Sequence, residues 1–242
     1  MPPKIYIGTA GWSIPRAAQR RFPAGESLLA RYAKVLPAVE INSTFYRPHQ
    51  ASTFERWAAS VPRSFRFSVK LPQTITHEQG LAKTAKLLDI FLADLAPLGS
   101  RLGCLLAQLP PSLAFDARAA RGFFTVLRKR FDRDVALEPR HASWFEDRAD
   151  RLLKEFKVAR VAADPPRAAG GDAPGGWQGL AYFRLHGSPR MYYSSYEQGS
   201  LDALAVKLGD LRRRRVPAWC IFDNTTLGAA TGNALSLMQR VE

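Results

Sequence analysis

The chain has 242 residues, 46% of them hydrophobic, and a formal net charge of +14. This length and apolar content allow one sizeable core, and an α/β barrel commonly uses roughly 250 residues as one domain. No apolar run approaches the roughly 20 residues that cross a bilayer, and the opening stretch lacks the pattern of a secretory signal. We therefore expect a single domain over residues 1–242, a cytoplasmic location and no membrane partner. The excess positive charge attracts anions, either small molecules or nucleic acid.

Eight short apolar runs, each ending in a polar cluster, recur along the chain and predict eight parallel strands. They lie at residues 4–12, 38–46, 65–72, 102–111, 134–144, 157–164, 180–187 and 217–224. Helical periodicity and composition occur between them, at residues 27–36, 52–62, 81–98, 117–131, 148–156 and 201–215. This alternation predicts an α/β fold, and eight units favour a single-domain TIM-type (β/α)8 barrel, irregular at the short second helix.

The segment Asp164–Trp177 breaks this alternation. It is rich in proline, glycine and alanine where a sixth helix is expected. Little apolar surface is available there to offset the entropy of ordering the backbone, so the segment predicts a mobile loop. A lid over the carboxyl ends of the strands and a loop without a role are equally open interpretations.

Polar side chains gather at the carboxyl ends of the predicted strands. Residues two apart in a strand share a face, so Glu40 and Asn42 point away from the helices that Val39 and Ile41 face. The same spacing groups Glu138 with Arg140 and Arg184 with His186, and the other strands contribute Thr9, Lys70, Gln108, Asp164, Asp223 and Asn224. Barrel active sites occupy this face, which favours a ligand or catalytic site over a charge network that only holds the loops.

Seven motifs occur in an order and spacing that resembles the YecE-like family, also called domain of unknown function 72. They are GTAGW, VEINSTFYR, FRFSVKLP followed by ITH, LLAQLPPSL, ALEPRHASWF, YFRLHG and CIFDNTTLGAATGNA, and together they cover nearly the whole chain. The resemblance implies an α/β barrel and does not imply a reaction. Many relatives read ERFRHPSW where this chain has EPRHASW, and some read FNN for FDN, so Asp223 is a weaker candidate than Asn224.

Two kinds of chemistry fit these residues. Without a metal, Glu138 or Glu40 is a general base and Lys70 or His186 an acid, so these four are the catalytic candidates. A divalent cation held by Glu138, Asp164 and His141 is the alternative. The candidate ligand contacts are Thr9, Trp12, Asn42, Tyr46, Gln108, Arg140, Trp144, Arg184 and Asn224. The two arginines among them suit a phosphate or carboxylate, and the aromatic side chains suit a sugar or base.

We therefore predict an anionic-ligand site at the carboxyl-end face, in an enzyme acting on a phosphorylated, sugar-like or nucleotide-derived substrate. A hydrolase and an isomerase, with or without a divalent metal, both stay open. The alternative is a nucleic-acid-binding protein without catalysis, which the net charge supports. Against it, the basic runs at residues 128–130 and 212–215 end helices and should lie on the opposite face. A scaffold or regulatory binder without chemistry is a third interpretation.

Overall fold

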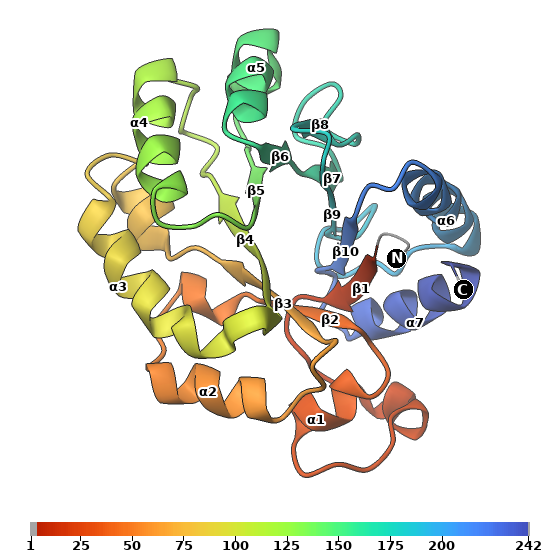
Figure 1. Ribbon diagram of the computed structural model, residues 1–242. Coiled ribbons are helices and arrows are strands. Elements are labelled where there is room, and N and C mark those ends of the chain that lie inside the picture. Colours follow the sequence, from red (N-terminus) through yellow and green to blue (C-terminus); the bar gives the residue numbers. More distant parts are fainter. Residues whose placement is uncertain (1–3, 242) are drawn as a thin grey trace.

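The computed structural model describes residues 4–241 as an α/β fold with parallel strands inside and helices outside (Figure 1). The strands are β1 (Ile5–Thr9), β2 (Ala38–Ile41), β3 (Arg66–Lys70), β4 (Leu102–Gln108), β5 (Asp134–Glu138), β6 (Val158–Arg160), β7 (Ala162–Asp164), β8 (Gly175–Gly176), β9 (Ala181–Leu185) and β10 (Ala218–Phe222). The α-helices are α1 (Leu28–Ala33), α2 (Ala51–Ala59), α3 (Ala85–Leu95), α4 (Ala117–Arg128), α5 (Asp147–Glu155), α6 (Gln198–Arg213) and α7 (Ala229–Val241). Short helical turns complete the list: η1 (Arg16–Arg21), η2 (Ser43–Phe45), η3 (Thr74–Glu78), η4 (Ala96–Arg101) and η5 (Ala142–Phe145).

The strands form two hydrogen-bonded sheets. One has the order β1-β10-β9-β7 and the other β2-β3-β4-β5-β6-β8, with β8 the antiparallel member of the second sheet. A single bridge between Ala10 and Glu40 joins the β1 and β2 edges. On the other side, β8 is the edge strand of the second sheet, and only Val161 separates β6 from β7 along the chain. The Val161 N–H donates to the carbonyl of Leu137. The predicted parallel α/β architecture is confirmed, whereas the described residues do not form one continuous closed ladder.

A tyrosine from α1 interrupts the pairing of β1 with β2. The Tyr32 hydroxyl accepts a hydrogen bond from the Thr9 N–H at 2.9 Å and donates to the Ala38 carbonyl at 3.0 Å. It thereby satisfies one backbone donor and one acceptor that a strand ladder would otherwise pair. Gly8 allows this close approach, because a Cβ there would lie 2.0 Å from the Ala38 oxygen.

Alternate strand residues enter two separate hydrophobic clusters. The larger lies between strands and helices and includes Val39, Val69, Leu137 and Phe183. The smaller contains residues of the opposite strand parity: Ala38, Cys104, Leu106, Ala136, Ala159, Val161, Leu180, Tyr182, Trp219 and Ile221. Of the predicted strand-end residues, this second parity is shared by Glu40, Lys70, Gln108, Glu138, Arg184, His186 and Asp223, which continue the face of the smaller cluster toward the carboxyl ends. Thr9, Asp164 and Asn224 have the parity of the larger cluster instead, so the prediction that they share this face is wrong.

All six predicted helical segments contain an α-helix, and α7 adds one that the sequence did not predict. The signal is clear in α4, where the Asp116 side chain accepts from the Ala119 N–H at 2.7 Å. Its buried residues Ala120, Phe123, Phe124 and Leu127 repeat with helical spacing. By contrast, α7 contains Thr, Gly, Asn and Ser, which weaken the helical signal. Within residues 4–241, no helix is both long and apolar enough to cross a membrane.

The segment after Asp164 takes the place of a sixth helix and runs beside β6. Its end forms β8, which pairs antiparallel with β6. The Gly176 N–H donates to the Asp150 carboxylate at 2.6 Å, and the Ala163 N–H donates to the Gly171 carbonyl at 2.8 Å. These contacts hold the second half of the segment between β6 and α5.

Candidate functional site

A fully buried arginine lies at the centre of the polar strand ends. Arg184 of β9 donates to both carboxylate oxygens of Glu40, from Nε at 2.9 Å and Nη2 at 2.6 Å. Its Nη1 lies 2.7 Å from Glu138, and Nη2 lies 3.1 Å from Asp223. The guanidinium is therefore paired with three carboxylates: Glu40 of β2, Glu138 of β5 and Asp223, the residue after β10. Arg184 joins the strand ends and does not present a free fork to a ligand.

His186 lies between two of the same carboxylates. Its Nδ1 is 3.0 Å from Asp223 and its Nε2 is 3.0 Å from Glu138. Arg140 then contacts the same Glu138 oxygen through Nη2 at 3.2 Å. The side chains of Asp223, His186, Glu138 and Arg140 thus form a continuous hydrogen-bonded chain along which a proton can be held or moved.

The charges of this chain stabilise one another. Burial opposes ionisation of Glu138, but Arg184 and His186 hold its pKa well below the usual range. Burial likewise opposes ionisation of Asp223, and Arg184 and His186 lower its pKa. Burial disfavours the charged form of His186, yet the Glu138 and Asp223 carboxylates raise its pKa. The arrangement therefore favours a protonated imidazole between two ionised carboxylates.

A further hydrogen bond, from Tyr182, holds the Glu40 carboxylate in place. The Tyr182 hydroxyl donates to Glu40 at 3.0 Å and lies 2.8 Å from the Ser68 hydroxyl. Its ring stacks on Trp219, with centroids 6.0 Å apart. Tyr182 is two residues before Arg184, and Ser68 is two before Lys70, so strand alternation explains why both face the network.

Lys70 ends β3 within the same face but outside the ion-pair network. Its Nζ lies 4.0 Å from the centroid of the Phe45 ring, and the residue is 4% exposed. Its backbone carbonyl accepts from the Thr44 hydroxyl at 2.6 Å, which fixes the strand end against η2. Burial first, and then the charge of Arg184, lower the Lys70 pKa to about 8. Carboxylates of the network oppose this shift without forming an ion pair with Nζ.

His77 interacts electrostatically with two other basic side chains, Lys70 and Arg140, and the three form a basic group. Burial lowers the pKa of His77, and the positive charges of Lys70 and Arg140 lower it further. The His77 ring packs edge-on against Phe45 at 4.9 Å. The Nε of Arg140 is buried and has no hydrogen-bond partner. A positively charged region that contains a hydrogen-bond donor without a partner therefore lies beside the hydrogen-bonded chain.

Several residues that were predicted to contact a ligand instead make contacts within the protein. The Thr9 side chain bonds the Tyr32 hydroxyl at 2.9 Å, and the Trp144 indole donates to the Leu113 carbonyl at 3.0 Å. Trp12 packs edge-on against Trp57 at 5.0 Å. Asn224 donates to the carbonyl of Ser194 and to the side-chain oxygen of Asn233, each at 2.8 Å. These contacts position the loops around the site.

Two other residues that were predicted to contact a ligand, Asn42 and Gln108, lie near the strand ends. Asn42 follows β2 and has a buried side-chain oxygen without a hydrogen-bond partner. Gln108 ends β4 and is paired in register with Glu138.

The three predicted metal ligands do not lie together. Glu138 is bonded to Arg184 and His186, whereas His141 caps η5 through the Ser143 hydroxyl, 2.9 Å from its Nδ1. Asp164 instead faces a hollow that Ser188, Ser194 and Ser195 also line. Among residues 4–241, no three His, Cys, Asp or Glu side chains are grouped so as to hold a metal ion.

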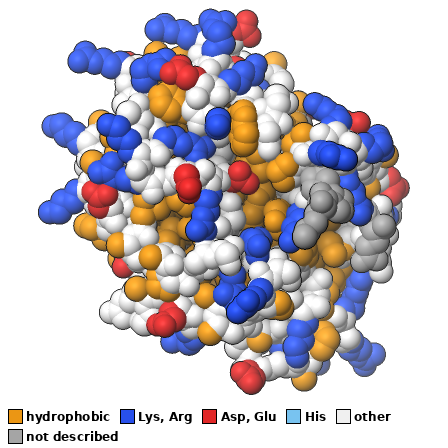
Figure 2. Space-filling model, in the orientation of Figure 1, with side chains coloured by type: hydrophobic (Ala, Val, Ile, Leu, Met, Phe, Trp, Pro, Cys, Tyr) orange, Lys and Arg blue, Asp and Glu red, His pale blue; other side chains and the backbone are white. Residues whose placement is uncertain are grey.

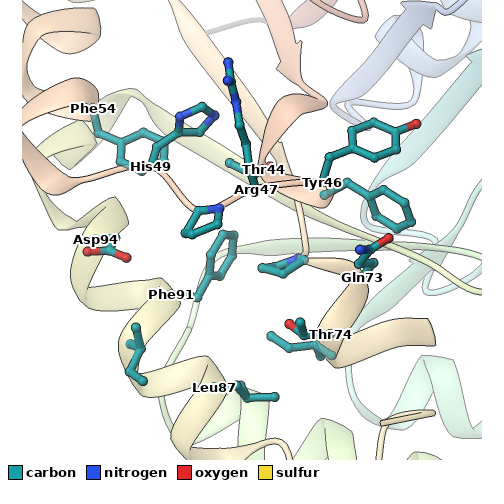
Figure 3. A pocket seen from close by; sticks show the side chains of 15 residues that line it. Thr44, Tyr46, Arg47, His49, Phe54, Gln73, Thr74, Leu87, Phe91 and Asp94 are labelled. Carbon is teal, nitrogen blue, oxygen red and sulfur yellow. The ribbon is translucent and has the colours of Figure 1, made fainter. Parts of the chain in front are cut away.

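A separate apolar pocket of about 190 Å³ lies next to the basic group, between η2 and α3 (Figure 3). Leu87 and Phe91 of α3 face the loop that carries Tyr46 and His49, while Arg47 extends away from them. Phe45 lines this pocket and also contacts Lys70. Tyr46, which is 68% exposed, therefore belongs to the pocket rim and not to the charged network.

Sequence reasoning did not rank His77, Tyr182 or Ser68 among the site residues. The strand parity of Tyr182 and Ser68 could have revealed them. His77 lies in η3, outside the strands, so its signal was the ITH motif of the family resemblance and not strand parity. Asp223, treated as the weaker candidate, makes two contacts to the network.

Parallel sheets that bring a buried charged network to the carboxyl ends of their strands define an α/β protein with a candidate polar site. The chain belongs to the family described as protein of unknown function DUF72, whose model matches residues 6–242. The resemblance predicted from the seven motifs is confirmed. A curated relative, UPF0759 protein YunF of Bacillus subtilis (strain 168), is 24% identical over 269 aligned residues, covering 98% of this chain and 95% of that protein.

Other relatives agree. UPF0759 protein YecE of Escherichia coli (strain K12) is 32% identical over 166 residues, which cover 66% of this chain and 59% of that protein. A crystal structure of a DUF72 family protein from Enterococcus faecalis V583 matches with a TM-score of 0.83 at 22% identity, over 98% of this chain and 95% of that one. A DUF72 family protein from Thermotoga maritima MSB8 matches with a TM-score of 0.78 at 26% identity, over 97% and 98%. These structures share the fold.

Proposed function

We propose that residues 1–242 form a single-domain, interrupted (β/α)8 barrel with its functional site at the carboxyl ends of the strands. The bridge between Ala10 and Glu40 supports this closure because it joins β1 to β2, and the chain runs from β6 of one sheet into β7 of the other with only Val161 between them. Separation of strand residues into two clusters also supports it, since a barrel has an interior and an exterior face.

The proposed site binds the anionic group of a small molecule. The observation that carries this proposal is the grouping of Lys70, His77 and Arg140, with the Arg140 Nε buried and unpartnered. Arg184 was predicted to bind the anion, but its charge is neutralised by three carboxylates. We therefore assign the anion contacts to Lys70 and Arg140. Charge-assisted hydrogen bonds from these donors suit a phosphate or carboxylate.

The same site has the groups needed for proton transfer. Glu138 and His186 are the proposed acid–base pair, because they share a hydrogen bond and are connected to Arg140 and Asp223. Glu40 acts by holding Arg184 in place. The proposed function is therefore an enzyme that transfers a proton on a phosphorylated, sugar-like or nucleotide-derived substrate.

Phosphate binding tests this proposal. Inorganic phosphate and pyrophosphate would be titrated into the protein at low ionic strength, with affinity measured by calorimetry. We expect Lys70→Met and Arg140→Met each to weaken binding by about tenfold or more, because each removes a charge-assisted contact. Arg130→Met is the matched control, because Arg130 is paired with Asp89 on the surface. No saturable binding by the parent protein, or equal affinity in all variants, would contradict an anion site.

Nucleic-acid binding without catalysis has less support. Lys and Arg side chains are spread around the face shown in Figure 2. Several basic residues of the two runs are also used locally. Arg130 pairs with Asp89, Arg213 and Arg214 with Asp210, and Arg128 donates to backbone carbonyls. Affinity for single- or double-stranded DNA that falls steeply with salt and depends on residues 212–215 would favour this alternative.

A further inference from the structure

Lys70 differs from the other cations of the site in having no carboxylate partner. Arg184 contacts three carboxylates and Arg140 contacts Glu138. None of the ion pairs found within residues 4–241 includes Lys70, whose Nζ instead lies 4.0 Å from the centre of the Phe45 ring. A buried amine on an aromatic face, with Arg184 and not a carboxylate as its strongest charged influence, occupies the environment of a nucleophilic lysine.

This environment changes the protonation of the amine. Burial and the Arg184 charge lower the Lys70 pKa to about 8. Roughly a tenth of the molecules then have a neutral Lys70 amine at neutral pH, whereas an ordinary lysine is neutral in fewer than about one molecule in a thousand. Only the neutral amine has the lone pair that attacks an electrophilic carbon.

We propose that Lys70 forms a Schiff base with an aldehyde or ketone that carries a phosphate or carboxylate, an inference that rests on the anion site proposed above. The Nζ lone pair attacks the carbonyl carbon, a C–N bond forms, and the carbonyl oxygen takes up a proton. That oxygen proton comes from the nitrogen, and the resulting carbinolamine then loses its hydroxyl group together with the second nitrogen proton as water, while the C=N bond forms. One water leaves for each imine formed, and hydrolysis by one water restores the free lysine.

The neighbours of Lys70 suit both parts of such a substrate. Arg140 and His77 belong to the same group of basic side chains, which would bind the anionic group. The carboxylates of Glu40, Glu138 and Asp223 each act on Lys70 electrostatically, so their field favours the cationic iminium that follows protonation of the imine. The anionic group thereby orients the carbonyl toward Nζ, and the carboxylate network stabilises the adduct.

Reductive trapping tests the inference. The protein would be incubated with glycolaldehyde phosphate and with uncharged glycolaldehyde, each in the presence of sodium cyanoborohydride, which delivers hydride to the imine carbon and leaves a stable secondary amine. Peptide mass mapping then locates the adduct. We expect Lys70 to be modified, at least about tenfold faster by the phosphorylated aldehyde than by the uncharged one, because the anion site concentrates the former.

Two controls separate the Schiff base from the anion site. Lys154, half-exposed and paired with Asp150, reports the reactivity of an ordinary surface amine in the same sample. Lys70→Arg removes the nucleophile, so the adduct at this position should be lost, while phosphate binding is measured on the parent protein. Mapping in the parent protein remains decisive if that variant fails to fold.

The outcomes are distinct. Phosphate binding without selective modification of Lys70 would overturn the Schiff base and leave the anion site intact. Modification of Lys70 no faster than Lys154, or equally by both aldehydes, would also overturn it. Failure of phosphate to bind the parent protein would remove the proposed function itself, whatever the labelling.

Discussion

Arg184 is the residue on which the buried network depends. Three carboxyl side chains converge on its guanidinium, and both Glu40 and Arg184 are fully buried. A charge in such surroundings is stable only when it is paired and hydrogen-bonded. The bidentate contact with Glu40 meets this condition, and it also fixes the strand ends of β2 and β9 relative to each other.

Replacing Arg184 with methionine should therefore destabilise the protein strongly. The variant leaves three buried carboxylates without their shared partner, and breaking a buried ion pair typically costs about 3–5 kcal/mol. Urea denaturation would measure the change in unfolding free energy. Arg121→Met, which breaks an exposed pair with Glu155, is the control and should change stability little. Similar midpoints for the two variants would argue against the central role of Arg184.

At the scale of elements, the junction of β1 with β2 depends on a side chain from a helix. Tyr32 of α1 bonds backbone groups of both strands, and its residue is fully buried. The junction therefore combines one backbone bridge with one inserted hydroxyl. An element outside the sheets thus determines how the first two strands meet.

Tyr32→Phe tests this arrangement. Loss of the hydroxyl leaves the Thr9 N–H and the Ala38 carbonyl without their partner, and each buried unsatisfied group costs about 1–3 kcal/mol. We expect a loss of about 2–4 kcal/mol in unfolding free energy, measured by chemical denaturation. Tyr193→Phe is a matched control, since Tyr193 contacts Arg190 through its ring. An equal, small loss in both variants would show that water or a backbone shift replaces the hydroxyl.

The strands were predictable because a buried parallel strand is a short apolar run that ends at a polar turn, as in AYFRL of β9. α7 was not, because its Gly and Asn dilute the helical pattern, and its buried face includes Thr231 and Asn233 beside Ala230, Ala234, Leu235 and Leu237. The segment from Asp164 to Trp177 was correctly taken as non-helical. Its pairing with β6 depends on long-range contacts that a local pattern does not contain.

For the whole molecule, strand alternation predicted that Glu40, Glu138, Arg184 and His186 share a face. It did not predict that Arg184 would be neutralised, because spacing along a strand does not determine which charges pair across strands. The place of Lys70 outside that network also comes only from packing against Phe45 of η2. The residues were therefore predictable as a set, whereas their division into a structural network and an available amine required the three-dimensional structure.

Lys70 also links the stability of the whole molecule to pH. Its pKa falls from 10.5 in a free side chain to about 8 in the folded protein, because of burial and the Arg184 charge. Between these two values the unfolded chain binds more protons than the folded one, so stability rises with pH across this window. The difference in unfolding free energy between the parent protein and Lys70→Met should grow by on the order of 2–3 kcal/mol as the pH rises from the folded pKa to the unfolded pKa of Lys70.

Urea denaturation of both proteins at closely spaced pH values would measure this difference, in which the other titrating groups largely cancel. Lys154→Met is the control, because it removes an exposed lysine that pairs with Asp150 at the surface. A difference between the parent protein and Lys70→Met that does not change with pH would mean that the Lys70 amine is solvated in the folded state and keeps an ordinary pKa. Since the neutral amine is what the Schiff base requires, that result would also weaken the case for Lys70 as a nucleophile, independently of any substrate.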